Sequence, residues 1–522
     1  MVPNGAAVVG LVGPRIAGGV LVGAVGLGRR DLNWWVRSQP LGHRTGSDIF
    51  YALYSDLLQQ PPSLTNLVAL LESPYPLPAA ALPHAIHSRY SICAGPPCPA
   101  GVLPQVWTPA VGSILPMLSE RLAEGDQLQL LGDEAAIAEQ TLPFTGGWLG
   151  WLGYDLAWEI ERLPTLNSDS LPFPVALWYK PATFAVLDHQ AQRLWLFASS
   201  PEALDAMEKQ LSLPATKVAP TAPATGDPRA VTLGMAATEY QQSVLRAKQH
   251  IQAGDVFQVN LSLRFSTETT VHSWALYRQL QRINPSPFAC YWRTPWGDVI
   301  SCSPERLVKL QEGVAQTRPI AGTRPRGSTP AQDAELAQTL LSNPKERAEH
   351  IMLVDLERND LGRVCQWGTV QVDELLTVEY YSHVMHLVSN VVGKIGSDSR
   401  SGGLRQPTAI DLIRAVFPGG TITGCPKVRC MEIIEDLEPV RRSLFYGSCG
   451  YLDRRGYLDL NILIRTLLVG HTDSLLTTST VWGQVGAGIV ADSDPAKEWQ
   501  ESLQKARAQL LALGLGELRH SL

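Results

Sequence analysis

Two hydrophobic periods alternate along the chain. Between about residues 34 and 213, short apolar runs such as 183–187 (TFAVL) and 194–198 (LWLFA) are separated by turns, a pattern typical of strands. From residue 238 the apolar side chains recur at helical spacing, with Thr238 as a candidate N-cap and Gly254 at the expected helix end. The apolar positions of this helix are Tyr240, Val244, Leu245, Ala247 and Ile251.

The next segment, residues 256–265 (VFQVNLSLRF), alternates with period two and predicts a strand. Gln258, Asn260 and Ser262 share one face of this strand. The other face is apolar and carries Val259, Leu261 and Leu263. Further helix and strand segments continue to about residue 511, so both element types run through the chain.

Two segments lack either period. Residues 1–32 are largely apolar and glycine-rich, and Pro14 and Arg15 divide them into pieces shorter than the roughly 20 residues of a membrane helix. Two arginines follow the apolar part, whereas a signal peptide carries its charge first. We expect a disordered extension or a start codon placed too far upstream, with a membrane anchor as the alternative. Residues 214–229 are rich in Pro, Ala and Thr and predict a surface linker.

Composition limits the classes of function. The 522 residues, 45% of them hydrophobic, allow a large core of two to four ordinary domains. A formal net charge of −6 argues against nucleic-acid binding. The eight cysteines are scattered without CxxC spacing, which is typical of a reducing, cytoplasmic setting. We therefore expect neither a nucleic acid nor a membrane as partner.

Two pairs of glutamates have the spacing that places both carboxylates on one helix face. Glu346 and Glu349 form the first pair, and Glu498 and Glu501 form the second. Asp494 is a candidate N-cap for the second helix. Two such acidic faces brought together suit Mg²⁺, which prefers hard oxygen ligands. The alternative is solvated surface charge paired with the neighbouring Lys345, Arg347, Lys497 and Lys505.

Three glycine-rich segments either let backbone amides approach a ligand carboxylate or are ordinary tight turns. They are residues 321–327 (AGTRPRG), 417–427 (FPGGTITGCPK) and 483–493 (GQVGAGIVADS). The second segment lacks the Lys-Ser/Thr step of a nucleotide P-loop because Pro426 intervenes, which excludes an ATP site.

Two polar side chains stand in apolar, strand-like runs. Arg465, in LNILIRTLLV, needs a carboxylate partner if it is buried, either from a protein Asp or Glu or from a substrate. His386, in VMHLVS, is either a core histidine with satisfied hydrogen bonds or part of a site.

The chain contains seven motifs in succession: PIAGTRPRG, AEHIMLVDLERNDLGRV, VMHLVS, TGCPKVRCMEII, GSCGYL, IRT and GAGIVADS. In this order they resemble the chorismate-utilising enzymes, a family that includes anthranilate synthase component I, aminodeoxychorismate synthase component I, isochorismate synthase and salicylate synthase. The resemblance is strong over about residues 235–511 and weaker in 66–91 and 143–155. It implies an α+β class, a single large chorismate-binding fold with two orthogonally packed antiparallel-rich sheets and surrounding helices. Residues 33–213 are then its N-terminal part and residues 230–513 its chorismate-binding catalytic part.

The resemblance also implies roles for the matching positions. Glu305, in SPERL, resembles the general acid that protonates the departing C4 hydroxyl, since hydroxide is a poor leaving group. The candidate catalytic residues are Glu305, Thr323 and His386. The candidate Mg²⁺ ligands are Glu349 and Glu501, with ligand waters held by Glu346 and Glu498. The candidate substrate-binding residues are Gly322, Thr323, Thr421, Tyr451, Arg465, Gly486, Gly488 and Lys505.

Gln258 helps to decide whether the nucleophile is water or ammonia. Family members that add water carry a lysine base at this place, and a neutral amide cannot take a proton from water, so the resemblance favours addition of ammonia. Ala321 replaces the lysine that attacks the ring in one class of aminodeoxychorismate synthases, so ammonia would add directly here. The aminodeoxychorismate branch is resembled at Asn260, Gly419-Gly420, Gly447-Ser448 and Asn461. The leading expectation is 4-amino-4-deoxychorismate as product, and the alternative is anthranilate.

No segment of the chain resembles a glutaminase, so the resemblance implies ammonia from a separate glutamine amidotransferase subunit or from solution. The segments LLES and NPSPFACYW resemble the family's tryptophan pocket. Its candidate residues are Glu72, Ser73, Asn284, Pro285, Ser286 and Phe288. A non-catalytic subunit that binds tryptophan or scaffolds an amidotransferase is the alternative of another class.

Overall fold

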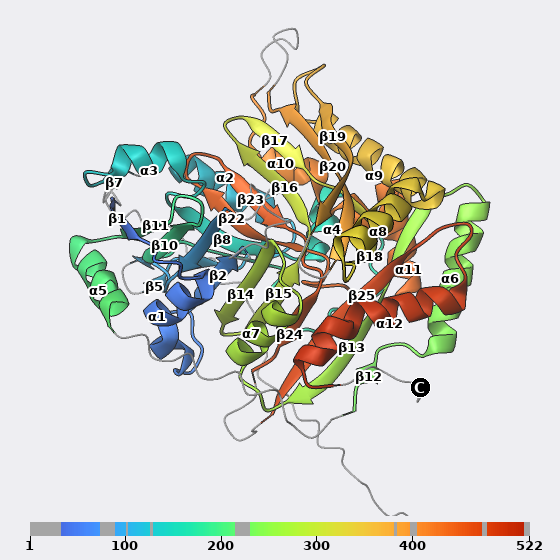
Figure 1. Cartoon of the computed structure of the whole chain (residues 1–522), viewed down its shortest axis with the longest axis horizontal. Coiled ribbons are helices and arrows are strands. Elements are labelled where there is room, and N and C mark those ends of the chain that lie inside the picture. The colour runs from blue at the N-terminus through green and yellow to red at the C-terminus, as the bar shows by residue number, and fades with distance from the viewer. Residues whose placement is uncertain are drawn as a thin grey trace, which may run out of the picture.

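The computed structural model describes residues 33–73, 89–100, 103–125, 129–213, 230–380, 384–396, 405–471 and 478–515. Most strands in these ranges belong to two large sheets, and Figure 1 shows helices surrounding both. The expected extension at residues 1–32 and the expected linker at 214–229 lie outside the described residues.

The larger sheet has thirteen strands. Across the sheet they are β12 (Thr232–Leu233), β13 (Gln258–Thr269), β25 (Ser479–Ile489), β24 (Thr466–Val469), β15 (Gly297–Ser303), β14 (Phe288–Thr294), β2 (Val68–Glu72), β3 (Tyr90–Ala94), β10 (Thr183–Asp188), β11 (Arg193–Ala198), β1 (Trp34–Pro40) and β7 (Leu130–Leu131), with β21 (Gly424–Cys425) attached to β13.

The second sheet has ten strands. Their order is β18 (Ile320–Pro325), β20 (Val384–Lys394), β17 (Val314–Thr317), β16 (Arg306–Gln311), β23 (Leu458–Asn461), β22 (Ser448–Asp453), β8 (Gly147–Leu152), β9 (Ala176–Tyr179) and β6 (Val106–Trp107), with β19 (Gln371–Tyr380) attached to β20. A separate small pair is formed by β4 (Pro99–Ala100) and β5 (Leu103–Pro104).

Strands from distant parts of the chain alternate within both sheets. In the larger sheet β2 pairs with β14, and in the second sheet β8 pairs with β22. Neighbouring strands among the described residues run antiparallel, apart from the short β1–β7 pair. The predicted α+β class, with two antiparallel-rich sheets surrounded by helices, is confirmed. Because each sheet takes strands from both sides of residues 214–229, neither half of the chain completes a sheet alone.

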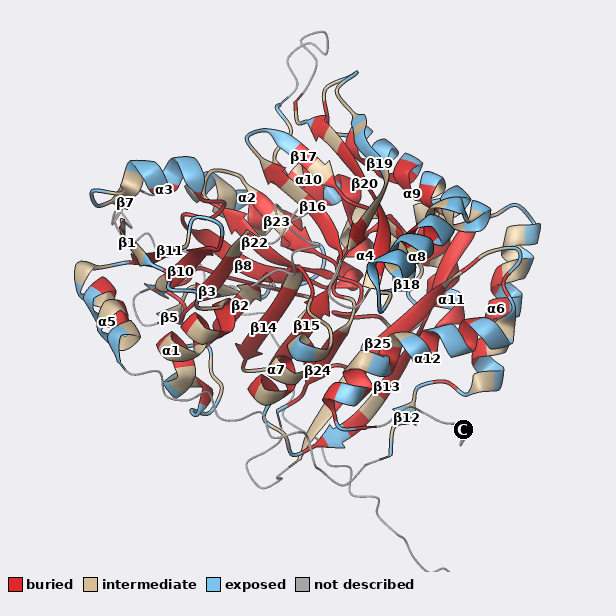
Figure 2. Ribbon diagram, in the orientation of Figure 1, coloured by how far each residue is buried: buried red, intermediate tan, exposed pale blue. Residues whose placement is uncertain are grey.

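Helices line the outside of the sheets, and Figure 2 shows their exposed outer faces against largely buried strands. They are α1 (Gly46–Leu58), α2 (Ile114–Gly125), α3 (Ala135–Thr141), α4 (Ala157–Ile160), α5 (Pro201–Ser212), α6 (Ala237–Gln252), α7 (Ser273–Ile283), α8 (Pro330–Ser342), α9 (Pro344–Gly362), α10 (Ala409–Val416), α11 (Lys427–Leu437) and α12 (Pro495–Ala512). None of the helices within the described ranges has the length and apolar character to cross a membrane.

An aromatic layer joins the two sheets. Trp151 of β8 meets Trp292 of β14 edge to face, with ring centroids 5.7 Å apart, and both side chains are fully buried. The Sγ atoms of Cys290 and Cys449 meet across the same layer at 3.4 Å. On the opposite face of the larger sheet, apolar side chains of α1, α5, α7 and α12 form a second core. The larger sheet is therefore covered on both faces.

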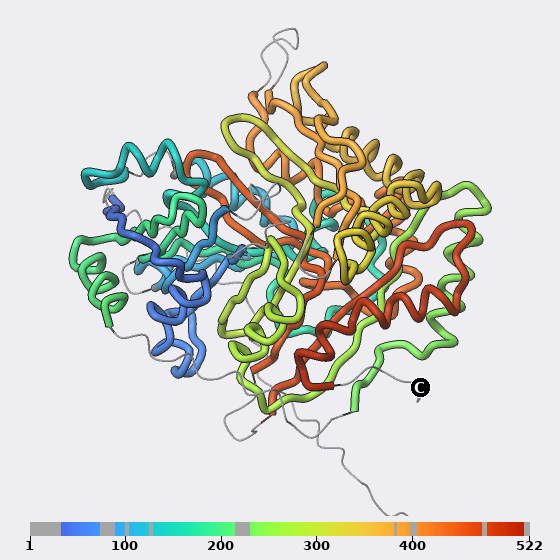
Figure 3. The backbone as a smooth tube through the Cα atoms, in the orientation of Figure 1, coloured from blue at the N-terminus to red at the C-terminus, as the bar shows by residue number. Residues whose placement is uncertain are grey.

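The strands predicted at 183–187, 194–198 and 256–265 are confirmed as β10, β11 and β13. In β13 the predicted division of faces also holds, because the apolar side chains enter a core with α6 and α11 while Gln258 and Asn260 line a cleft. Strand β13 pairs with β25 along its length, from Val259↔Ile489 to Thr269↔Ser479, and Figure 3 shows these two strands side by side.

The helix predicted after residue 238 is α6, but two details of the prediction are wrong. Its N-cap is Ala236, whose backbone N–H donates to the Glu239 carboxylate at 2.8 Å, so Thr238 lies inside the first turn. Leu245 is half-exposed, because it faces away from the α11 and β13 core that holds Val244. The helical period located the element, and tertiary packing decided its buried face.

We expect Trp151→Ala to destabilise the fold strongly, because it leaves a cavity in the layer between the sheets. Removing a large buried aromatic costs about 3–5 kcal/mol of unfolding free energy. Trp367 is 86% exposed, and the matched control Trp367→Ala should change stability by less than about 0.5 kcal/mol. Chemical unfolding followed by circular dichroism measures both variants. Equal stability of the two would show that the sheets do not depend on this contact.

Candidate active site

A cleft of about 1130 Å³ lies between β18 and α9 on one side and β25 and α12 on the other. Strand β13 and the 3-10 turn η3 (Gly420–Ile422) also contribute to its wall. The lining is rich in charged and amide side chains, which come from segments more than 200 residues apart in the sequence. The cleft is therefore a product of the whole fold.

Both predicted glutamate pairs line this cleft. Glu349 Oε1 accepts a hydrogen bond from Gln258 Nε2 at 2.9 Å, and Glu501 forms an ion pair with Lys505 at 2.9 Å. Burial raises the pKa values of Glu349 and Glu498, and the negative charge of Glu501 raises both further. The carboxylates of α9 and α12 are thus close enough to repel one another across the cleft.

This donor set fits a divalent cation that prefers oxygen. Glu346 pairs with Arg324 at 2.8 Å through one oxygen, while its buried Oε2 has no hydrogen-bond partner. Carboxylates that gain protons through mutual repulsion are stabilised in their charged form by a cation. Within the described residues, no three His, Cys, Asp or Glu side chains are already gathered at metal-binding distance. The chemistry of the glutamates on this wall of the cleft fits Mg²⁺.

Arg465 provides positive charge in the same cleft. The apolar run predicted as one strand is broken, because β23 ends at Asn461 and β24 begins at Thr466, and Arg465 between them has a φ of 53°. Its Nη1 donates to the carbonyl of Lys505 at 2.8 Å, and Lys505 Nζ donates to the carbonyl of Gly486 at 2.9 Å. No carboxylate of the described residues pairs with Arg465, although burial lowers its pKa. The alternative of a protein Asp or Glu partner is therefore excluded for these residues, and an anionic ligand fits.

Glu305 is a buried acid in the cleft wall. Burial raises its pKa to about 7, and the nearby Thr421 hydroxyl opposes part of this shift. Its backbone is held by Ser303, whose hydroxyl accepts from the Glu305 N–H at 3.3 Å and donates to the Ile462 carbonyl at 2.6 Å. A carboxyl group that remains partly protonated at neutral pH suits proton donation.

Thr323 and His386 form a hydrogen-bonded pair beside this acid. Thr323 Oγ1 lies 2.9 Å from His386 Nδ1 across the β18–β20 ladder. Burial, with a smaller effect of the Arg465 charge, lowers the pKa of His386 to about 4, so the imidazole is neutral at pH 7. Gly322 forms a bulge at φ 69°, where an added Cβ would lie 2.7 Å from Glu346 Oε2. The bulge turns Thr323 toward the cleft and brings Glu346 close to the backbone.

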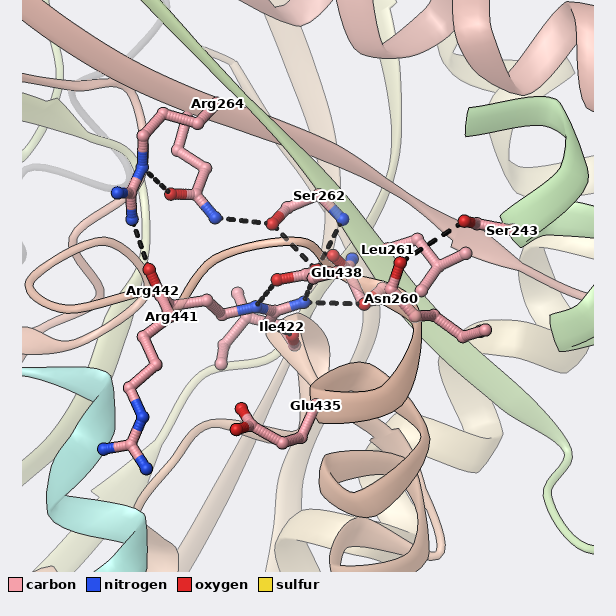
Figure 4. Close-up of polar contacts among 12 residues, drawn as sticks. Ser243, Asn260, Leu261, Ser262, Arg264, Ile422, Glu435, Glu438, Arg441 and Arg442 are labelled. Carbon is pink, nitrogen blue, oxygen red and sulfur yellow. Dashed lines mark hydrogen bonds and ion pairs between the residues drawn. The ribbon is translucent and has the colours of Figure 1, made fainter. Parts of the chain in front are cut away.

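A buried ion pair supports the wall from behind, as Figure 4 shows. Arg442 donates to Glu438 at 2.6 and 3.0 Å, to the carbonyl of Asn260 at 2.8 Å and to the carbonyl of Ile422 at 2.8 Å. Glu438 Oε1 also accepts from the N–H and hydroxyl of Ser262, each at 2.8 Å. The pair ties β13 and η3 together at the positions that carry Asn260 and Thr421.

Comparison with known proteins agrees with this arrangement. The family model for the chorismate binding enzyme matches residues 111–511. The chain belongs to the chorismate-binding enzyme family. An anthranilate synthase component I-like protein of Synechocystis sp. (strain ATCC 27184 / PCC 6803 / Kazusa) is 54% identical over 97% of this chain and 98% of that protein.

Two other relatives are similar over a smaller share of this chain. Aminodeoxychorismate synthase component 1 of Bacillus subtilis (strain 168) is 45% identical, covering 72% of this chain and 78% of that protein. The crystal structure of anthranilate synthase component I from Streptococcus pneumoniae TIGR4 aligns with a TM-score of 0.67 and 32% identity, covering 81% of this chain and 92% of that one. Components of anthranilate synthase and of aminodeoxychorismate synthase are thus both similar to this chain.

Most predicted site residues of this family member meet in the cleft. His386 contributes through Thr323 rather than as a lining residue. The predicted residues that line the cleft are Glu305, Gly322, Thr323, Glu346, Glu349, Thr421, Arg465, Gly486, Gly488, Glu498, Glu501 and Lys505.

Tyr451 is the exception, because the structure places it outside the cleft. It is buried on β22, packs against Phe144 at 5.4 Å between ring centroids and lines a second cavity. Tyr446 lines the cleft instead, in a left-handed conformation with φ 64°. Tyr446 and Tyr451 are five residues apart, and the sequence pattern does not show which of them lies in the cleft. The left-handed backbone at Tyr446 directs its ring into the cleft.

The second cavity, of about 110 Å³, contains part of the predicted tryptophan pocket. Ser73 and Phe288 line it, whereas the predicted Asn284, Pro285 and Ser286 do not. Glu72 also lines it, but its Oε2 accepts from the hydroxyls of Ser47 and Tyr277 and from Gln281 Nε2. The carboxylate of Glu72 is therefore occupied by α1 and α7, and a tryptophan pocket at this cavity stays a prediction.

Sequence reasoning missed the residues that support the cleft. Arg442 and Glu438 were not singled out, because they lie beyond the end of α11, where helical i,i+4 spacing does not apply. Arg324 and Gln484, which line the cleft, also had no role assigned. Arg324 stands in the motif PIAGTRPRG, so its place beside Thr323 was the available signal.

We expect Glu305→Gln to lower chorismate turnover by roughly 10²–10⁴-fold, because the positioned proton donor is lost. The unfolding free energy of this variant, by contrast, should not fall. Between the ordinary pKa of 4.5 and about 7 the unfolded chain loses this proton while the folded chain keeps it, so unfolding free energy falls as pH rises through that window. The variant lacks this loss and should be at least as stable as wild type at pH 8. A steady-state assay and denaturant unfolding at pH 5 and pH 8 measure the two effects. Wild-type turnover would remove Glu305 from the mechanism.

Proposed function

We propose that this chain binds chorismate in the cleft and, with Mg²⁺, aminates it to 4-amino-4-deoxychorismate. The observation that carries the proposal is the partly buried guanidinium of Arg465, which has no carboxylate partner among the described residues and lies in the same cleft as Glu305, whose pKa burial raises to about 7. A dianionic substrate with a hydroxyl leaving group needs both. Membership of the chorismate-binding family identifies that substrate.

Each group has a defined task. Arg465 and Lys505 hold the enolpyruvyl carboxylate, with the backbone of Gly486 close by. The glutamates of α9 and α12 would hold Mg²⁺, which would supply a counter-charge for the ring carboxylate. Glu305 donates its proton to the C4 hydroxyl, which leaves as water while the lone pair of ammonia forms the C4–N bond. The surplus proton of the new amine restores Glu305, so one ammonia replaces one water.

Gln258 and Asn260 favour this reaction over its relatives. Gln258 donates to Glu349 and is a neutral amide, so it offers no base to activate water. Asn260 is the cleft-lining residue among those that resemble the aminodeoxychorismate branch. Ser448 and Asn461, which also resemble that branch, bond to each other and to neighbouring backbone away from the cleft, so they support the product assignment only as family markers.

Anthranilate formation is the second candidate. The Synechocystis relative carries the name anthranilate synthase component I-like protein. Ala321 lines the cleft without a nucleophilic side chain, which suits direct addition of ammonia in either reaction. The two candidates differ in the carbon that ammonia attacks and in whether pyruvate then leaves.

A product experiment separates the candidates. Purified protein is incubated with chorismate, MgCl₂ and ammonium at alkaline pH, and the products are separated with and without added aminodeoxychorismate lyase. We expect p-aminobenzoate only when the lyase is present. Fluorescent anthranilate without lyase would assign the second candidate, and unchanged chorismate would favour a non-catalytic subunit.

We propose a separate glutamine amidotransferase subunit as the physiological source of ammonia. The relatives named above include "component 1" enzymes, a name that belongs to multi-component synthases. A reducing cytoplasm is the matching setting, because all eight cysteines are free thiols.

We expect Glu349→Gln and Glu501→Gln to raise the Mg²⁺ concentration needed for half-maximal activity by at least tenfold, because each removes a charged oxygen donor. Glu335, on the exposed face of α8, provides the matched control Glu335→Gln, which should leave this concentration unchanged. Activity titrations from micromolar to millimolar Mg²⁺ measure the shift. Full activity of both cleft variants at low Mg²⁺ would remove these glutamates from the metal site.

A further inference from the structure

An ion pair joins the two segments that form one side of the cleft. Arg324 Nη1 of β18 lies 2.8 Å from Glu346 Oε1 of α9, and both residues line the cleft. The two side chains are 24% and 19% exposed, so water reaches the pair. Ion pairs that water reaches are weak, because solvent screens the charges and both side chains lose freedom. The contact between Arg324 and Glu346 can therefore be exchanged for another partner.

Glu346 keeps its place without help from Arg324. Asn343 Oδ1 caps α9 and accepts from the Glu346 N–H at 3.2 Å. Glu346 Oε2 lies against the backbone of Gly322, where an added Cβ would be 2.7 Å away, and this oxygen has no hydrogen-bond partner among the described residues. A buried carboxylate oxygen without a partner costs free energy, and a cation relieves that cost. A divalent cation and Arg324 therefore compete for the same carboxylate.

The opposite side of the cleft repeats this arrangement. Lys505 of α12 pairs with Glu501 at 2.9 Å, and both residues line the cleft. Within the described part of the chain, the lining holds five glutamates and an equal number of Arg and Lys side chains. A divalent cation or a dianion that entered alone would upset this balance of charge. The two together leave the net charge of the cleft unchanged, which favours their binding as a pair.

We propose that Arg324 is an exchangeable counter-ion that couples binding of the divalent cation to binding of the substrate. Arg324 leaves Glu346 once the glutamates of α9 and α12 hold the cation, and its guanidinium then binds a carboxylate of chorismate. A guanidinium presents a planar set of N–H donors that matches a carboxylate, so it can form two parallel hydrogen bonds there. The inference rests on the proposed function. It adds a substrate-binding residue whose availability depends on the metal.

Substitution of Arg324 should change the two affinities in opposite directions. Arg324→Met keeps the apolar stem and removes the competing charge, so Mg²⁺ should bind roughly two- to fivefold more tightly when chorismate is absent. With Mg²⁺ saturating, the Kd for chorismate should rise on the order of tenfold, because a charge-assisted contact is lost. A purely structural defect would weaken both. Arg324→Lys retains the charge, and its Mg²⁺ affinity should stay within about twofold of wild type.

Arg326 provides the matched control. It pairs with Asp333 at 2.5 Å and does not belong to the residues that line the cleft. Arg326→Met should therefore leave both affinities within about twofold of wild type. Isothermal titration calorimetry with MgCl₂ and with chorismate measures the affinities in buffer without ammonium, so that chorismate is not aminated. Thermal melting shows that each variant is folded.

Unchanged or weaker Mg²⁺ binding in folded Arg324→Met would overturn the exchange, and so would an unchanged chorismate Kd at saturating Mg²⁺. Both results leave the proposed amination intact, since the wild-type protein still binds its substrate and metal. Wild-type protein that binds neither MgCl₂ nor chorismate would overturn the proposed function and the inference together.

Discussion

The buried ion pair between Arg442 and Glu438 fixes the positions of the segments that form the cleft wall. Arg442 is 1% exposed, and its guanidinium bonds to backbone carbonyls of two separate segments while it pairs with Glu438. A buried charge pair contributes little net free energy against apolar residues, but loss of one partner leaves a charge without compensation and is strongly destabilising. The pair therefore acts as a geometric constraint. It fixes the spacing between β13 and η3, and with it the width of the cleft wall.

A second constraint is electrostatic and concerns the acidic helices. Both α9 and α12 begin with a side-chain N-cap followed by proline, Asn343-Pro344 and Asp494-Pro495. Glu346 and Glu498 fall in the first turns, where the positive end of the helix dipole favours a carboxylate. The helix ends thus offset part of the repulsion between carboxylates before a cation arrives. The same caps fix the start of each helix, and hence the direction in which the i,i+3 pairs point.

The sequence identified elements and residue types well, because these follow from short-range pattern. Alternation in β13 and the Asp494 cap of α12 were read correctly from a few neighbouring residues. The place of Tyr446 in the cleft was not predicted, since it depends on a left-handed bend at residue 446 that no local period encodes. The break at Arg465 has the same origin: a largely apolar run of ten residues resembles one strand, but tertiary contacts place its two ends in different sheets.

The orientation of the Gln258 and Asn260 side-chain amides could not be predicted either. Amide residues on one strand face are common, and their orientation is set only by Glu349 from α9 and by Thr421 from η3. Motif resemblance supplied candidate roles, and the fold then determined which candidates meet. Side chains more than 200 positions apart become neighbours only through the two sheets.

The pairing of β13 with β25 has a consequence for how the chain is made. Strand β25 and helix α12 are synthesised more than 200 residues after β13, yet the longest partner of β13 and one side of the cleft come from them. Until β25 has been synthesised, β13 lacks this partner, and its backbone edge and apolar side chains are exposed. Such long-range pairing slows folding and exposes the nascent chain to aggregation. The long separation of β13 and β25 in the sequence therefore makes synthesis the stage at which the edge of β13 is most exposed.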